Sequence, residues 1–558
     1  MKELLRFLSM HPVLALELLA ASLLINLLGL ASSLYVIQVL NRYVGSGVDA
    51  TLITLTTGVV LAIAMEWWLR QLRRDLARGV VGGPMGRVAA GFFNALLGIK
   101  LSELLRLAAP MQREVLGHLS TVQKVYSPAT VVALLDVPFA LVFIAALMLI
   151  HPGVALISAL FLTVVFVITL LHQHRLDHPT RQVGQLAARH AALSGSVLTT
   201  AESVRVFNGT RLMRQRWWEQ LVELHREQTD LVNRQEGVQT LTQGIGALMG
   251  VVVIAYGAKL AVVGQMDTGL LIGANILAGR AMAPLLRFAQ LVPQLAKARQ
   301  GLEKLAQFSR LPLMREEGVA LRTCQGRIEL QGLGFAWPGA KGALFESLTV
   351  TAEPGTLLAV VGGNGTGKTT LMRLLTGLLE PQRGKILVDG YNLSQLAPEW
   401  WHQQLLYLPQ EPLFLDATLR ENLLTLQPDL SEEALHALVD RVGLRRFLNE
   451  SEQGLDLPIT DGGQRLSPGI RRRIALARAL VADGQLVLLD EPLEGLDNAG
   501  RKLFLELIKE LVSQGRTVIV ASHDAAMAQV ADGVVDLDVK PVPTVRLAAR
   551  TPRIGGAA

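Results

Sequence analysis

Long apolar stretches dominate the first half of the chain. Six runs are each close to the length of about 20 residues that spans a bilayer, and they lie at residues 13–40, 52–69, 131–150, 154–171, 241–263 and 270–292. This pattern predicts six membrane helices. A few polar residues lie in or beside these runs, and they either line a pathway or bond a neighbouring helix: Glu17, Asn26, Asp136, Asn275 and Arg280.

The connections between the apolar runs alternate in charge. Residues 70–124 carry nine Lys and Arg residues and residues 175–234 carry nine more, whereas the other connections carry almost none. Both basic connections, the N-terminus and everything after residue 292 are therefore expected in the cytoplasm. The helical periodicity of these connections predicts helices that extend beyond the bilayer. We expect them to return through turns near residues 100–103 and 208–211.

The second half of the chain has the pattern of an α/β domain. A polar stretch at residues 301–326 suggests a linker, and an alternating segment then begins at Arg327. Continuous apolar runs at 357–361, 486–490 and 518–521 predict buried strands. The 558 residues are too many for one core, and 50% hydrophobic against 18% charged residues favours a membrane protein. Cys324 is the only cysteine, which excludes an intrachain disulfide and a cysteine zinc site.

A glycine-rich loop follows the first of these strands. Residues 362–369 fit G-x-x-x-x-G-K-[ST], in which backbone N–H groups cradle phosphates at a helix N-terminus, the lysine reaches the β- and γ-phosphates and the hydroxyl binds Mg²⁺. The sequence therefore predicts ATP and Mg²⁺ as ligands. The predicted contacts are Gly362, Gly363, Asn364, Gly365, Thr366, Gly367, Lys368, Thr369 and Thr370.

The ends of the other predicted strands carry the remaining candidate chemistry. Asp490 would hold Mg²⁺ through water and Glu491 would polarise the attacking water. Gln410 would coordinate Mg²⁺ or orient water, and His523 would contact the γ-phosphate. Trp337 precedes the phosphate loop and is expected to stack on an adenine ring. Thr369, Gln410 and Asp490 form the expected metal set.

With these motifs in order, the chain resembles an ATP-binding cassette (ABC) exporter half-transporter. Walker A corresponds to residues 362–369, the Q-loop to Gln410, the signature to residues 466–471, Walker B to 486–490, the D-loop to Asp497 and the switch histidine to His523. The resemblance implies an α-helical six-span type-1 ABC exporter membrane domain followed by an α/β P-loop NTPase domain. The expected boundaries are 1–300 for the membrane domain, 301–326 for the linker, 327–545 for the cassette and 546–558 for a flexible tail.

Three segments are similar to the type I protein-secretion branch of that family: LYVIQVLNRYVGSG, LLDVPFALVF and GANILAGRAMAPL. This likeness implies a multi-pass protein of the bacterial inner membrane that works with a periplasmic adaptor and an outer-membrane channel. The cargo would be an unfolded polypeptide, often a calcium-binding repeat protein. A lipid or drug exporter, and a weakly hydrolysing regulatory subunit of a heterodimer, are alternatives. Nucleic acid is not an expected partner.

The signature departs from the family pattern. The usual LSGGQ is replaced by Leu-Ser-Pro-Gly-Ile at residues 466–470. In the family this segment closes over the ATP of a second subunit, which implies that Ser467 and Gly469 act in trans. Pro468 fits the first turn of a helix but has no N–H to donate, and Ile470 cannot hydrogen-bond a phosphate. We expect weakened closure, so either a partner subunit has an intact signature or a homodimer tolerates this one.

Overall fold

The computed structural model describes residues 12–44, 47–106, 117, 120–123, 126–340, 342–494, 496 and 498–547. The chain forms two compact units. The first comprises residues Met1–Leu97 with Arg106–Leu311, and the second comprises Gly98–Leu105 with Pro312–Ala558. The first of the two predicted cytoplasmic turns therefore belongs to the second unit. The finer boundaries expected from the sequence stay predictions.

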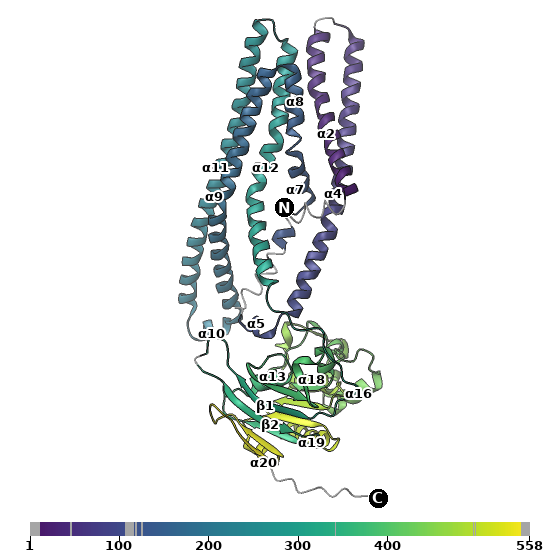
Figure 1. Ribbon diagram of the computed structural model, residues 1–558, viewed down its shortest axis with the longest axis vertical. Helices are drawn as coiled ribbons and strands as arrows, with labels where there is room; N and C mark the ends of the chain where they lie inside the picture. Colours follow the sequence, from purple (N-terminus) through teal and green to yellow (C-terminus); the bar gives the residue numbers. More distant parts are fainter. Residues whose placement is uncertain are drawn as a thin grey trace. The chain divides into compact units, whose positions relative to one another are not determined.

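The first unit is built from helices (Figure 1). By length and apolar composition, six helical segments within the described residues qualify as membrane spans, which confirms the predicted number. The helices are α2 (Pro12–Gln38) with a π-helical turn η1 (Val39–Tyr43), α4 (Asp49–Gly98), α7 (Pro128–Asp136), α8 (Ala140–Ile150), α9 (Pro152–Thr199), α10 (Ala201–Val206), α11 (Thr210–Val262) and α12 (Thr268–Phe308).

Helices α9 and α11 are much longer than a bilayer is thick. They contain 48 and 53 residues, so at 1.5 Å per residue they run for roughly 70 and 80 Å, against a hydrocarbon core of about 30 Å. Between them lies a tight turn at Asn208, which has a φ of 52°. The amide of Gly209 closes this turn by donating to the carbonyl of Val204 at 2.7 Å. The two long helices and the turn between them lie where the sequence predicts them, and their extension into the cytoplasm stays a prediction.

Helix α12 lies at the centre of the first unit and packs against α2, α8, α9 and α11. Small residues allow this close approach. A Cβ atom added at Gly273 would lie 2.2 Å from Cγ1 of Ile37, which leaves no room for any side chain. Methionine, leucine and alanine side chains from α12 then complete a buried cluster with α8, α9 and α11.

Buried and partly buried polar residues of this unit bond one another across helices. The guanidinium of Arg73 on α4 donates to Asp136 on α7 at 2.5 and 3.4 Å, and to the hydroxyl of Ser22 on α2 at 3.1 Å. Arg280 on α12 donates to the hydroxyl of Ser32 on α2 at 2.7 Å. Of the two roles open to Asp136, the structure shows a contact between helices.

The second unit contains a mixed sheet with the order β12-β11-β3-β10-β9-β6. Its five parallel strands are β3 (Leu357–Val361), β6 (Leu405–Leu408), β9 (Leu486–Asp490), β10 (Thr517–Ala521) and β11 (Gly533–Asp536), and β12 (Thr544–Leu547) pairs antiparallel at the edge. The carboxyl ends of β3, β10, β9 and β6 lie side by side. Residues that follow these strands therefore converge on one edge of the sheet.

The remaining strands and helices pack around this sheet. An antiparallel sheet has the order β2-β1-β4-β5, and its strands are β1 (Ile328–Phe335), β2 (Phe345–Ala352), β4 (Arg383–Val388) and β5 (Tyr391–Asn392). Its apolar face shares a core with α13 (Lys368–Leu375). Another core joins the other face of the parallel sheet to the helices α15 (Leu419–Leu423), α16 (Glu432–Arg441), α17 (Arg445–Glu450), α18 (Pro468–Leu480) and α19 (Asn498–Ser513).

The shorter elements are α5 (Leu101–Arg106), η2 (Leu393–Gln395), α14 (Pro398–Gln403), β7 (Ala417–Thr418), η3 (Gly454–Asp456), β8 (Pro458–Ile459), η4 (Asp461–Gly463) and α20 (Ala525–Val530). Strands β7 and β8 pair with each other. The segment around α5 is attached to the rest of the second unit by two contacts of Lys100. Lys100 donates its backbone N–H to the carbonyl of Pro312 at 3.1 Å and forms an ion pair with Glu380 at 2.8 Å.

The Arg73–Asp136 pair generates a stability prediction. Asp136→Asn leaves a buried guanidinium without its counter-charge, so we expect a loss of about 3–5 kcal/mol and a clear fall in the thermal midpoint in detergent. The double variant Arg73→Met/Asp136→Leu should recover most of the lost stability. Asp75→Asn is the control, because the Asp75–Arg78 pair is 65% and 72% exposed and is worth less than about 1 kcal/mol. An Asp136→Asn variant as stable as wild type would contradict the prediction.

Candidate nucleotide site

The loop after β3 has a backbone that requires glycine. Gly367 caps α13 with a φ of 113°, and a Cβ atom there would lie 2.7 Å from Cδ2 of Leu344. Gly362 has a φ of 150°, and a Cβ atom there would lie 2.8 Å from Oγ1 of Thr366. Gly363, Asn364 and Gly365 form the exposed crest of the loop, while Thr370 is buried on α13. A helix N-terminus of this kind favours an anion.

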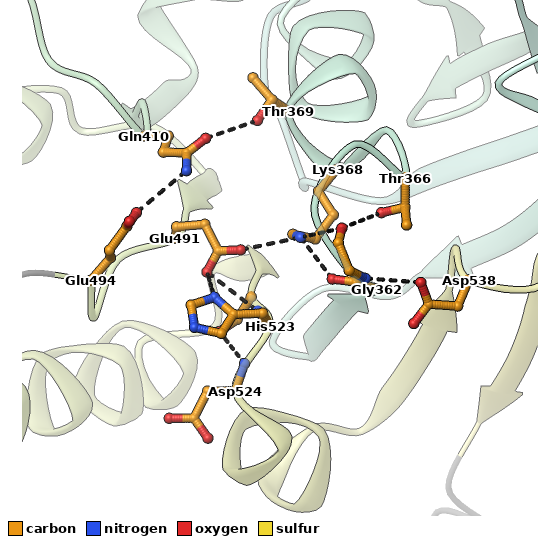
Figure 2. Close-up of polar contacts among 12 residues, drawn as sticks. Gly362, Thr366, Lys368, Thr369, Gln410, Glu491, Glu494, His523, Asp524 and Asp538 are labelled. Atoms are coloured by element: carbon orange, nitrogen blue, oxygen red, sulfur yellow. Dashed lines mark hydrogen bonds and ion pairs between the residues drawn. The ribbon is translucent and has the colours of Figure 1, made fainter. Parts of the chain in front are cut away.

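Lys368 lies across the inside of this loop and is 7% exposed. Its Nζ donates to the carbonyls of Gly362 at 2.7 Å and Gly363 at 3.0 Å, and it lies 3.3 Å from Oε1 of Glu491 (Figure 2). These contacts use the three donors of an ammonium group. A phosphate in the loop would compete with the carbonyls for a lysine that is already positioned.

Two residues near the C-terminus also hold the loop, and sequence reasoning missed both. Oδ1 of Asp538 accepts the amide of Gly363 at 2.9 Å, and Nζ of Lys540 donates to the carbonyl of Thr366 at 2.7 Å. Partial burial lowers the pKa of Lys540, and Asp538 opposes this effect. Both residues follow β11, which pairs with β3. The available signal was a charged stretch after an apolar run, at the same edge of the sheet.

Asp490 ends β9 and is fully buried. Among the described residues neither of its carboxylate oxygens has a hydrogen-bond partner. Burial is the main cause that raises the pKa of this carboxyl, the nearby hydroxyl of Thr369 opposes the effect, and the neighbouring Glu491 adds to it. Across the site, the hydroxyl of Thr369 donates to Oε1 of Gln410 at 3.5 Å. A buried carboxylate that makes no hydrogen bond of good geometry, beside a hydroxyl and an amide oxygen, fits Mg²⁺, which prefers oxygen ligands.

Glu491 lies next to this carboxylate and is held from two sides. Its Oε2 accepts the ring Nδ1 of His523 at 2.9 Å and the backbone N–H of His523 at 3.3 Å, while Oε1 faces Lys368. Glu491 has a φ of 49°, a left-handed conformation that costs about 1–3 kcal/mol outside glycine and is common where geometry serves a site. Its amide donates to the carbonyl of Ala521 on β10 at 2.8 Å, which fixes that conformation.

The signature segment forms the start of α18, as predicted for a proline in the first turn. The hydroxyl of Ser467 accepts the amide of Ile470 at 3.3 Å and caps the helix. The side chain of Ile470 packs against the core below. At Gly469 nothing lies within 4 Å of an added Cβ atom, so this position faces open space. Ser467 and Gly469 therefore remain available at the surface, whereas Ile470 does not replace the polar side chain of the usual pattern.

Two further expected site residues have different outcomes. Trp337 is half-buried and meets the ring of Phe335 edge-to-face, with ring centroids 5.3 Å apart. Its stacking on adenine stays a prediction. Asp497 and the tail from residue 548 onward lie outside the described residues. The structure thus brings together Lys368, Thr369 and Gln410 with the residues that follow β9 and β10.

Comparisons with known proteins agree with this geometry. The family described as ABC transporter transmembrane region matches residues 16–285, and the family described as ABC transporter matches residues 345–494. The type I secretion system ATP-binding protein PrsD of Rhizobium meliloti (strain 1021) is 27% identical over 91% of this chain and 87% of that protein. The alpha-hemolysin translocation ATP-binding protein HlyB of Escherichia coli O157:H7 is 25% identical over 94% of this chain and 74% of that protein.

A solved structure of a bacterial Atm1-family ABC exporter with ATP bound is also similar. Its TM-score is 0.82 at 20% sequence identity, and the match covers 96% of this chain and 95% of that chain. This likeness shows the fold and confirms the expected fold class.

The environment of Asp490 predicts opposite effects on stability and ligand binding. Asp490→Asn removes a charge that is destabilised by its burial, so the nucleotide-free protein should melt at a higher temperature while its stabilisation by Mg²⁺ and ATP is lost. A raised pKa means that the folded state holds the proton more tightly, so the carboxylate destabilises increasingly as pH rises. The difference from wild type should shrink as pH falls toward about 4.

Differential scanning fluorimetry with and without Mg²⁺ and ATP measures both effects. Asp483→Asn is the matched control, because its side chain is 86% exposed. A melting temperature of Asp490→Asn below that of wild type at neutral pH, or full retention of the Mg²⁺-dependent shift, would contradict the assignment.

Proposed function

Because the chain belongs to the ABC transporters, in which a transmembrane region is joined to an ATP-hydrolysing domain, we propose that it exports an unfolded polypeptide across the bacterial inner membrane. The observation that carries this proposal is the likeness to type I secretion and toxin translocation ATPases over more than nine-tenths of the chain. By this proposal it works as a dimer with a periplasmic adaptor and an outer-membrane channel, and its cargo is an RTX-type protein.

The described residues support a specific division of labour in ATP hydrolysis. Backbone amides of the loop and Lys368 bind the β- and γ-phosphates, and Trp337 stacks on the adenine. Thr369, Gln410 and Asp490 would hold Mg²⁺, which supplies positive charge to the phosphates when bound. Glu491 orients and polarises the water that attacks the γ-phosphorus. ADP leaves and inorganic phosphate forms.

His523 has two roles in this scheme. Its ring and backbone both bond Oε2 of Glu491, so it holds the carboxylate in one orientation, and its exposed ring is placed to reach the γ-phosphate. Lys368 faces the other oxygen of the same carboxylate. The water-activating group is thus fixed before substrate arrives, which lowers the reorganisation needed in the transition state.

The charge pattern supports a cytoplasmic location for the nucleotide-binding half. The two long connections with nine Lys and Arg residues each flank alternate spans, and such connections stay on the cytoplasmic side. ATP is then supplied from the cytoplasm. Closure of two nucleotide-binding halves over ATP would switch the membrane helices between inward and outward access.

The altered signature determines how fast such a dimer turns over. Purified chain in lipid nanodiscs should hydrolyse ATP, and Glu491→Gln should abolish the turnover. Pro468→Gly/Ile470→Gln should raise it about 10-fold or more, because a restored hydrogen bond to a charged group is worth about 1.5–3 kcal/mol. Unchanged turnover would mean that Ser467 and Gly469 suffice. No turnover from a wild-type chain that binds ATP would favour a heterodimer with an intact signature in the partner.

Cargo class is tested in the source bacterium. With Glu491→Gln in place of the wild-type gene, we expect one or more polypeptides to disappear from the medium and to accumulate in the cell. An unchanged set of secreted proteins, together with altered membrane lipids or drug sensitivity, would favour the lipid or drug exporter instead. The variant keeps the folded chain, so the loss reports on ATP-driven transport.

A further inference from the structure

A buried arginine connects the signature helix to the metal side of the same nucleotide site. Arg472 lies one turn beyond the capping Ser467 on α18 and is 8% exposed. Its Nη2 donates to the backbone carbonyl of Gln410 at 3.2 Å and lies 3.6 Å from Oε2 of Glu494. One guanidinium nitrogen therefore contacts two segments that follow different strands of the parallel sheet.

Glu494 and Gln410 continue this connection toward the phosphate loop. The side-chain amide of Gln410 donates to Oε2 of Glu494 at 3.3 Å and accepts from Thr369 at 3.5 Å (Figure 2). Glu494 follows Glu491 in a turn closed by a backbone bond of 3.3 Å. A continuous set of polar contacts thus runs from the expected Mg²⁺ ligand Thr369, through Gln410 and Glu494, to the first turns of α18.

Because Arg472 is buried, its side chain depends on the few acceptors that it contacts. Desolvation lowers the pKa of Arg472, and the carboxylate of Glu494 offsets this effect. Among the described residues Nη1 of Arg472 has no hydrogen-bond partner, so the side chain depends on the contacts of Nη2. Separating a buried guanidinium from its acceptors is energetically unfavourable. Movement of Gln410 would therefore move the start of α18 with it.

We propose that Arg472 and Glu494 are positioning residues that couple occupancy of the chain's own phosphate loop to the placement of its signature segment, which acts on the ATP of a second subunit. This inference rests on the proposed dimeric ATPase. Neither residue belongs to the expected nucleotide contacts. Their effect is to align Ser467 and Gly469 when Mg²⁺ and ATP draw Thr369 and Gln410 together.

Steady-state ATP hydrolysis in nanodiscs tests the coupling. We expect Arg472→Gln and Glu494→Gln each to lower kcat about 10-fold with KM for ATP within twofold of wild type, since alignment is needed for turnover rather than for binding. The double variant should be no slower than the slower single variant, because both changes break the same connection. Arg446→Gln is the control, since the exposed Arg446–Glu450 pair lies on α17 with 91% of the arginine side chain exposed. It should match wild type.

Several outcomes would overturn the proposal. One is a loss of kcat in the double variant that equals the product of the two single losses. Another is a kcat that falls only in proportion to a lower melting temperature. The third is a wild-type kcat in both single variants. A wild-type chain that binds ATP but is inactive would instead count against turnover by a homodimer, and the coupling would then be judged by hydrogen exchange. The two failures are therefore distinguishable.

Hydrogen exchange tests the coupling without relying on activity. At equal ATP occupancy, Mg²⁺ and ATP should slow exchange in wild type both around residue 410 and across residues 466–476. In Glu494→Gln the protection should be confined to the phosphate loop. Equal protection of residues 466–476 in both proteins would overturn the inference, and so would the absence of any ATP effect there in wild type.

Discussion

The carboxylate of Glu491 is shared between a cation and an imidazole, and the nucleotide site depends on that arrangement. Lys368 lies 3.3 Å from one oxygen, and the ring Nδ1 of His523 donates to the other at 2.9 Å. These residues come from α13, the end of β9 and the end of β10, so one buried carboxylate joins three elements. Its left-handed backbone is held by the bond from its amide to the carbonyl of Ala521 on β10.

The same constraint operates elsewhere in the chain. A charge that cannot reach water needs a partner of opposite charge or a set of donors, and here the partner is often on a distant element. Arg73 meets Asp136 across helices of the first unit, and Arg472 meets Glu494 in the second. Asp490 is the exception among the described residues, because it is buried and neither of its carboxylate oxygens makes a hydrogen bond of good geometry. That exception is what indicates a cation as its ligand.

The altered signature and the buried arginine both affect the placement of α18. Pro468 and Ile470 remove polar groups from the face of the helix that would meet a second subunit's ATP, and Ser467 uses its hydroxyl to cap the helix. The placement of α18 then depends more on its contacts with the rest of its own chain. Arg472 supplies such a contact from within the same chain.

Local order along the chain was determined by the sequence itself. The spacing of apolar residues and glycines predicted a strand at residues 357–361 and a helix that begins at Lys368, and the structure has both. The six membrane spans followed from length and composition, because the bilayer imposes the length. The ends of the parallel strands also indicated which carboxylates would converge, since such strands place their carboxyl ends at one edge.

Only the tertiary structure decided which distant residues meet. Asp538 bonds an amide 175 positions away, and this contact requires β11 to pair with β3 in one register. Arg73 meets Asp136 across 63 positions of the chain, and Arg472 reaches Gln410 only because α18 lies beside β6. Short-range spacing carries no information on such pairings. Packing decides these pairings, because many arrangements of helices and strands could have placed a partner beside each buried charge.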